Sequence, residues 1–215
     1  MNRIDLLASL AKDSNVLLDV GCDHAYTVIS ACKNYNVKKA IASDIGNLPL
    51  EVAKSNIIKS GLQEQIKIVK SDGLKQIDDD FDTLIISGMG GLLIKDILNS
   101  STRKIKNKKL ILSPNRDYAE VRLFLSENGF NIIDEYAFYD NKIFYEIIVA
   151  IPGNMNVSTF EIKYGPILLQ KKDADFIDYY HKQYDKLSNA LKNTKKDSEK
   201  DNLKSLISEY QKIIE

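Results

Sequence analysis

The amino-acid sequence predicts an α/β fold in which a mostly parallel sheet is followed by a helical hairpin. Two observations support this prediction. Between residues 15 and 129, short apolar segments alternate with segments of helical periodicity, which is typical of parallel strands covered on both faces. Beyond residue 158 the strand-like segments stop, and apolar residues recur at steps of three and four.

Each element of the predicted sheet domain follows from its local pattern. Ile4, Leu7, Leu10 and Ala11 share one face of an N-terminal helix. Short apolar runs predict five strands, at residues 15–21, 37–44, 66–70, 81–87 and 108–114. Helices are expected after four of these strands, at residues 24–35, 48–62, 91–100 and 117–129. Gly61 and Gly129 stand where glycine commonly ends a helix.

Two further strand-like segments depart from this alternation. Residues 130–140 and 142–151 are separated only by a short turn at Asp140-Asn141. A parallel pair would need a crossover of a dozen or more residues, so these strands must pair antiparallel. A seven-stranded sheet that ends in such a hairpin is the class I methyltransferase variant of the Rossmann-like fold, whereas a dehydrogenase would continue with strand–helix units.

The remaining residues are expected to form a separate helical unit. The prediction is a Rossmann-like domain over residues 1–157 and a C-terminal coiled-coil domain over residues 158–215, with 152–158 as the linker. Polar residues 193–202 separate two apolar stripes and are expected to connect two antiparallel helices. The stripes contain Phe176, Tyr180, Tyr184, Leu187 and Leu191, then Leu203, Leu206, Tyr210 and Ile213.

Composition and charge favour no particular partner. Thirty basic and thirty acidic residues cancel, although residues 102–109 carry five positive charges and no acid. That segment is either a solvated loop or a contact for RNA. The longest uncharged stretch, residues 83–94, is too short for a membrane helix, which needs about 20 residues.

Neither the cysteines nor the N-terminal segment indicates export or metal binding. Cys22 and Cys32 lack metal-ligand spacing and are expected to remain reduced, and Asp5 interrupts any apolar signal segment. We therefore expect a cytoplasmic protein that needs no metal ion or membrane. The sequence does not determine the oligomeric state, and a monomer is the working expectation.

The carboxyl ends of the predicted strands carry the residues of chemical interest, because open parallel sheets bind ligands there. Asp19, Gly21, Cys22 and Asp23 follow the first strand without the G-x-G-x-x-G pattern of dinucleotide-binding folds. Acidic residues at this turn would repel a phosphate but suit a ligand with a cationic amino-acid end. Asp23 could alternatively cap the following helix.

The later strand ends extend this pattern. Asp44 ends the second strand and could accept hydrogen bonds from both hydroxyls of a ribose, or could be a solvated strand end. Asp72 and Gly73 follow the third strand, where a carboxylate and amides could bind an adenine edge. Residues 88–91, Gly-Met-Gly-Gly, allow close backbone approach or simply form a turn. Together these positions outline a site for S-adenosylmethionine.

Several of these motifs resemble a known family. The segments DVGCDHAY, SDGL, ISGMGG and LSPN, with Arg122 and the GF that follows it, resemble the bacterial TrmK family of tRNA adenine-N1 methyltransferases, which modify position 22. The resemblance covers essentially the whole chain. Two residues depart from the family pattern. Cys22 stands where a serine or other small residue is expected and keeps the small size. Asp44 stands where glutamate is common and keeps the charge.

The resemblance implies S-adenosylmethionine as cofactor, S-adenosylhomocysteine as product and tRNA as partner. It implies a substrate pocket at His24, Tyr26 and Asn115, to which we add the Asp23 carboxylate as a candidate acceptor near the base. His24 could instead be a packing or capping residue in the first helical turn, and Tyr26 could belong to the core. The expected cofactor-binding residues are Asp19, Gly21, Cys22, Asp44, Ile45, Asp72, Gly73, Gly88, Met89 and Gly90.

Such a site would catalyse methyl transfer mostly by positioning the base and the cofactor. Adenine N1 already carries a lone pair, so no strong base is needed, and acceptors near the base would stabilise the cationic product. Arg116 and the helical hairpin are the expected contacts to RNA backbone. Two alternatives are a methyltransferase for another nucleobase or small molecule, and a non-catalytic RNA-binding adaptor with a vestigial cofactor pocket.

Overall fold

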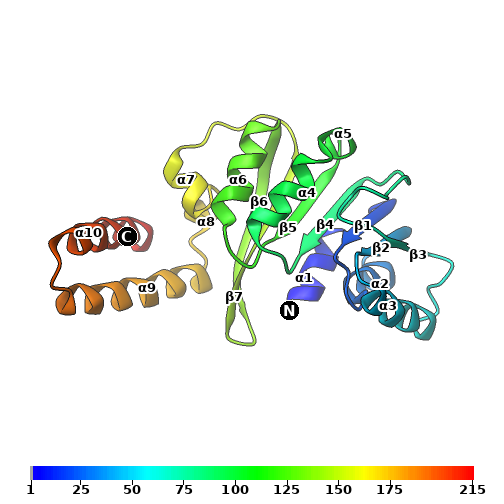
Figure 1. Ribbon diagram of the computed structural model, residues 1–215, viewed down its shortest axis with the longest axis horizontal. Helices are drawn as coiled ribbons and strands as arrows, with labels where there is room; N and C mark the ends of the chain where they lie inside the picture. Colours follow the sequence, from blue (N-terminus) through cyan, green and yellow to red (C-terminus); the bar gives the residue numbers. More distant parts are fainter. Residues whose placement is uncertain (1) are drawn as a thin grey trace.

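The computed structural model describes residues 2–215 and contains one seven-stranded sheet (Figure 1). The strand order is β3-β2-β1-β4-β5-β7-β6, with β7 antiparallel to both of its neighbours and the other pairs parallel. This is the predicted fold. The strands are β1 (Val16–Val20), β2 (Lys39–Asp44), β3 (Ile66–Lys70), β4 (Thr83–Ser87), β5 (Lys109–Ser113), β6 (Phe130–Asp140) and β7 (Ile143–Pro152).

Helices cover both faces of this sheet. On β1, Leu17 points into the apolar cluster formed with the first three helices, and Leu18 points into the cluster on the opposite face, because successive strand residues alternate sides. The helices are α1 (Arg3–Leu10), α2 (Tyr26–Asn34), α3 (Asn47–Lys59), α4 (Gly91–Asn99), α5 (Thr102–Ile105), α6 (Tyr118–Glu127), α7 (Thr159–Tyr164), α8 (Leu168–Lys171), α9 (Ala174–Asn193) and α10 (Asp197–Ile214). Within residues 2–215, none of these helices is long and apolar enough to cross a membrane.

The local signals for turns and helix ends are largely confirmed. After α3, the Gly61 N–H donates to the Ile58 carbonyl and the Leu62 N–H to the Ile57 carbonyl, with Gly61 at φ +72°, which is a Schellman motif. The β6–β7 turn is formed by Asn141 and Lys142, both at positive φ, one residue later than predicted. A two-residue turn with positive φ at both positions matches the right-handed twist of the paired strands.

Two charged segments differ from the solvated connections expected there. Residues 193–202 are not all a connection, because α10 already begins at Asp197. The basic segment 102–109 contains the short helix α5, and three of its lysines contact other parts of the chain. Lys104 Nζ donates to two backbone carbonyls, Lys108 pairs with Asp80, and Lys109 Nζ donates to the Leu10 carbonyl at 2.6 Å. These lysines stabilise the amino-terminal side of the sheet.

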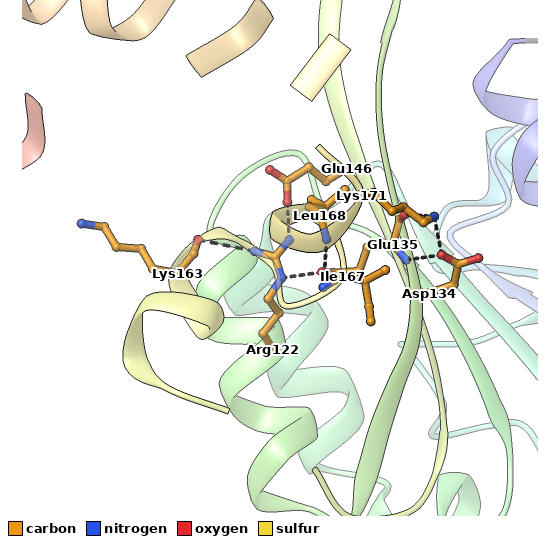
Figure 2. Close-up of polar contacts among 8 residues, drawn as sticks. All are labelled: Arg122, Asp134, Glu135, Glu146, Lys163, Ile167, Leu168 and Lys171. Carbon is orange, nitrogen blue, oxygen red and sulfur yellow. Dashed lines mark hydrogen bonds and ion pairs between the residues drawn. The ribbon is translucent and has the colours of Figure 1, made fainter. Parts of the chain in front are cut away.

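A buried ionic cluster joins the sheet to the segment after it (Figure 2). Arg122 on α6 donates to Glu135 on β6 at 2.7 Å and to Glu146 on β7, and all three side chains are almost fully buried. Glu135 Oε2 also accepts the backbone N–H groups of Ile167 and Leu168, at 2.9 and 3.3 Å. The chain between β7 and α9 is therefore held against the sheet, although α7 and α8 were not predicted.

The helical hairpin of α9 and α10 extends from this region and lies beyond the end of the sheet (Figure 1). Phe176 and Tyr180 of α9 are buried in a third apolar cluster with Tyr164, Leu168 and Ile213. Tyr179 stacks on Phe144 of β7 with ring centroids 3.9 Å apart. Only the proximal part of the hairpin thus packs against the sheet.

Candidate active site

A cavity of about 420 Å³ opens at the carboxyl ends of β1 and β4, where the strand order reverses. Open α/β sheets bind ligands at this switch point because neighbouring loops diverge there. The residues that line it are Arg3, Ile4, Asp19, Gly21, Cys22, Asp23, His24, Tyr26, Thr27, Asp44, Ser87, Gly88 and Met89. Nine of these thirteen are among the site residues predicted from the sequence.

Asp19 places a buried carboxylate at the floor of the cavity. It belongs to β1 and is 2% exposed. Burial raises its pKa from 3.8 to about 7, the nearby Asp44 charge adds to this effect, and Arg3 opposes it. Keeping Asp19 ionised in this buried position therefore costs free energy, and a cationic ligand group beside it would lower that cost.

The turn after β1 is shaped by Gly21. Its φ is +76°, and its N–H donates to the Ser43 carbonyl at 2.8 Å, as does the N–H of Cys22 at 2.9 Å. A Cβ at position 21 would lie 2.3 Å from Met89 Cε, so a side chain here would clash with Met89, which packs on this glycine. Burial raises the pKa of the Cys22 thiol far above neutrality, so this residue fills space rather than acting as a nucleophile.

Asp44 is fixed at the end of β2 by two backbone amides. Its Oδ1 accepts the Gly46 N–H at 2.9 Å, and its Oδ2 accepts the Asp23 N–H at 3.3 Å. Each carboxylate oxygen retains a second lone pair for a ligand hydroxyl. The next residue, Ile45, is 64% exposed and presents an apolar surface beside this carboxylate.

His24 and Tyr26 lie at the wall of the cavity, before and at the start of α2. The helix begins at Tyr26, and Ala25 occupies the N-cap position without a side-chain cap. The alternatives that Asp23 caps the helix and that His24 sits in its first turn are therefore wrong; Asp23 is instead left-handed, at φ +46°. Tyr26 is 50% exposed, so it is not a core residue either.

The histidine ring is oriented but retains hydrogen-bonding capacity. His24 Nε2 lies 3.5 Å from Asp23 Oδ2, and the His24 and Tyr26 ring centroids are 5.7 Å apart. His24 Nδ1 is buried and has no hydrogen-bond partner among residues 2–215. A buried nitrogen of this kind is costly unless a ligand satisfies it.

Asn115 stands beside the cavity on the turn after β5. Its Nδ2 donates to the Gly88 carbonyl at 2.7 Å, and its backbone N–H donates to the Met89 carbonyl at 2.8 Å. The residue is exposed, and with its amide nitrogen engaged in this way the side-chain oxygen is the atom left to accept a hydrogen bond. Gly90 lies close to Arg116, whose Nε is 3.4 Å from Asp117 Oδ2.

Five predicted residues do not line the cavity: Ile45, Asp72, Gly73, Gly90 and Asn115. Asp72 is engaged elsewhere, since its carboxylate pairs with Lys75 at 2.5 Å and its N–H donates to Gln76 Oε1 at 2.8 Å. Conversely, Arg3, Ile4, Thr27 and Ser87 line the cavity but were missed. Ser87 precedes the Gly-Met-Gly-Gly turn and could have been found from the strand-end rule, whereas nothing local distinguishes Arg3.

The lining residues fit an adenosylmethionine-type ligand. Carboxylates at positions 19, 23 and 44 suit the ammonium and hydroxyl groups of such a ligand. Within the described residues, no three histidine, cysteine or acidic side chains gather as a metal site.

Comparisons with known proteins identify the family. Residues 17–215 match the family model of TrmK, tRNA (adenine(22)-N(1))-methyltransferase. The chain belongs to this family. It is 32% identical over 203 residues to the tRNA (adenine(22)-N(1))-methyltransferase of Bacillus subtilis, covering 87% of this chain and 85% of that protein.

Solved structures agree with this assignment. The Streptococcus pneumoniae protein Sp1610, in complex with S-adenosyl-L-methionine, superposes with a TM-score of 0.91 at 32% identity and covers 100% of both chains. M. capricolum TrmK, in complex with S-adenosylhomocysteine, superposes with a TM-score of 0.87 at 27% identity, covering 99% of this chain and 96% of that one. The predicted family, fold, methyltransferase class and cofactor are thereby confirmed.

Proposed function

We propose that this chain transfers a methyl group from S-adenosylmethionine to N1 of adenine 22 in tRNA. The observation that carries the proposal is that the Asp19 and Asp44 carboxylates, His24 and Tyr26 line one cavity in a chain of the TrmK family. The cofactor, when bound, supplies a methyl group that is already activated by the adjacent sulfonium charge.

The cofactor would be held by strand-end residues. Asp44, whose orientation is fixed by two amides, would accept hydrogen bonds from the ribose hydroxyls. Asp19 and the Gly21 turn would face the amino-acid end, and Gly88 and Met89 would border the reacting group. Ile45, Asp72 and Gly73 would lie on the adenine side of the ligand, outside the cavity, and Gly90 would follow Gly88 and Met89 along the β4 turn.

The target adenine would enter above His24, Tyr26 and Asn115. An enzyme that modifies a base must extrude it and hold it against apolar or aromatic groups, and the exposed Tyr26 ring provides such a surface. Asn115 Oδ1 and Asp23 would accept hydrogen bonds from the exocyclic amine, which gains acidity as N1 becomes cationic. These contacts position N1 toward the methyl group and stabilise the developing charge.

The C-terminal unit, residues 158–215, is proposed to contact tRNA through its backbone. Exposed lysines at positions 186, 192 and 195 lie toward the distal end of the α9–α10 hairpin, where phosphate contacts would position the RNA without reading its sequence. We further propose that the protein acts as a cytoplasmic monomer, away from membranes and without a bound metal ion.

The test is incubation of the protein with labelled S-adenosylmethionine and unmodified bulk tRNA, followed by digestion to nucleosides. Label in N1-methyladenosine is the expected result. Label in another nucleoside would indicate a different target base, and tRNA binding without label would indicate a non-catalytic adaptor. Either of these results would overturn the proposal.

A further inference from the structure

The segment that carries His24 has a strained backbone. His24 lies between two residues in the left-handed region, Asp23 at φ +46° and Ala25 at φ +61°. The Cβ atom makes this region unfavourable, and alanine has no polar side-chain group that could compensate by a local hydrogen bond. Ala25 is nevertheless fully buried and occupies the N-cap position of α2. A backbone conformation of this kind persists only where neighbouring groups hold it.

The first half of this segment is attached to β2. The N–H groups of Gly21 and Cys22 both donate to the Ser43 carbonyl, at 2.8 and 2.9 Å, and the Asp23 N–H donates to Asp44 Oδ2 at 3.3 Å. These bonds lie on the side of the segment that would hold the cofactor. That side therefore has an attachment of its own to the sheet.

The second half of the segment is contacted by Asn56, a half-buried residue of α3. Its Nδ2 donates to the His24 carbonyl at 3.0 Å. The Ala25 N–H donates to the Cys22 carbonyl at 2.7 Å and closes the turn. Because α2 begins only at Tyr26, the His24 carbonyl precedes the helix, and the amide of Asn56 attaches it to a neighbouring element.

The contacts of the His24 ring itself are weak. Its Nε2 lies 3.5 Å from Asp23 Oδ2 with both side chains partly exposed, and its Nδ1 has no hydrogen-bond partner among residues 2–215. The backbone therefore decides where the ring points. We propose that Asn56 is a positioning residue for methyl transfer, which holds the left-handed segment so that His24 and Tyr26 face the target adenine. This inference rests on the proposed function, because it concerns the residues assigned there to the base.

The test measures methylation of tRNA and binding of the cofactor separately. One hydrogen bond of ordinary strength corresponds to roughly a 3- to 10-fold change in an equilibrium. Asn56→Ala should lower kcat for tRNA methylation by about that factor, with kcat expressed per cofactor-binding site counted by calorimetry. The affinity for S-adenosylmethionine should stay within about twofold, because β2 still holds the cofactor side. An unchanged kcat, or an equal loss of cofactor affinity, would overturn the proposal.

Asn56→Asp separates the hydrogen bond from packing. The aspartate has nearly the same shape as asparagine, but its carboxylate has no N–H to donate. A positioning bond predicts that kcat falls at least as far as in Asn56→Ala. A value near that of the wild type would indicate a packing role and contradict the proposal. Ser60→Ala, which removes a hydrogen bond to the Ile57 carbonyl within α3, is the matched control and should change neither kcat nor cofactor affinity.

A double-mutant cycle tests whether Asn56 acts through the strained segment. Ala25→Gly removes the Cβ that makes the left-handed conformation costly, so the segment needs less support. Asn56→Ala should therefore lower kcat by a smaller factor in the Ala25→Gly background than in the wild type. An equal or larger factor would overturn the role of Asn56 alone. If the wild type forms no N1-methyladenosine in tRNA, both this inference and the proposed function fail.

Discussion

Arg122 Nε and Glu135 Oε1 lie 2.7 Å apart in a contact where neither side chain is exposed to solvent. Burial opposes the charge on Arg122, but Glu146 and Glu135 more than compensate and raise the pKa of the guanidinium. Because Glu135 also accepts two N–H groups from the start of α8, the pair links α6, β6 and the segment that leads to α9. Arg122 is therefore a structural residue, and it does not line the cofactor cavity.

Replacement of Arg122 by methionine should destabilise the protein by about 3–5 kcal/mol, since it leaves two buried glutamates without a counter-charge. Urea unfolding monitored by circular dichroism measures this change. Glu120→Gln is the matched control, because its ion pair with Lys95 at 2.7 Å is partly exposed and contributes at most about 1 kcal/mol. Equal stability of the two variants would contradict the role of the buried cluster.

Asp19→Asn should stabilise the cofactor-free protein while weakening cofactor binding. The folded-state pKa of about 7 exceeds the ordinary value of 3.8, so the folded protein holds this proton more tightly than the unfolded chain does. Ionisation of Asp19 therefore costs stability as the pH rises between about 4 and 7. The gain in unfolding free energy for the variant should be larger at pH 8 than at pH 5. A gain that does not change with pH would contradict this account.

Asn115→Ala should lower kcat at least about tenfold and leave the affinity for S-adenosylmethionine within about twofold, because Asn115 lies outside the cofactor cavity and would act on the base. Steady-state kinetics and calorimetry provide the two measurements. Asn128→Ala, which removes a hydrogen bond to the Phe124 carbonyl at the end of α6, serves as the control. Loss of cofactor affinity together with kcat would place Asn115 in the cofactor site instead.

Shortening the hairpin should separate RNA binding from cofactor binding. Tyr180 and Tyr210 are paired, with ring centroids 5.2 Å apart, so residues 187 and 203 stand opposite each other on α9 and α10. Replacing residues 187–203 by a short Gly-Ser loop keeps the proximal aromatic cluster and the contacts of Glu135. KM for tRNA should rise at least about tenfold with unchanged calorimetric affinity for S-adenosylmethionine. Unchanged KM for tRNA would contradict the proposed contact.

The sheet could be predicted from the sequence because buried parallel strands produce short, continuous apolar segments. The third strand was predicted at its observed bounds, Ile66–Lys70, and the strand-end rule brought Asp19, Gly21 and Asp44 into one cavity. The start of α2 was predicted two residues early because Asp23 and Ala25 adopt left-handed backbone conformations, which are uncommon for alanine and interrupt the helix before Tyr26.

Long-range contacts were the part that the sequence could not supply. Arg3 reaches the cavity only because α1 packs beside α2 and the β6–β7 hairpin folds back against it. In the sequence Arg122 is notable only through a family resemblance, and only the fold shows that it neutralises Glu135 and Glu146. Similarly, the sequence left residues 102–109 open as an RNA contact, and the structure shows Lys104, Lys108 and Lys109 engaged with backbone carbonyls and Asp80.

The central claim is that the methyl group is transferred to N1 of adenine 22. A methyl group at N1 blocks the Watson–Crick edge, so reverse transcription of a tRNA transcript treated with the protein and S-adenosylmethionine should stop next to position 22. A matched transcript with guanine at that position should give full-length product. A stop at another adenine, or a stop that persists in the guanine-22 transcript, would contradict the claim.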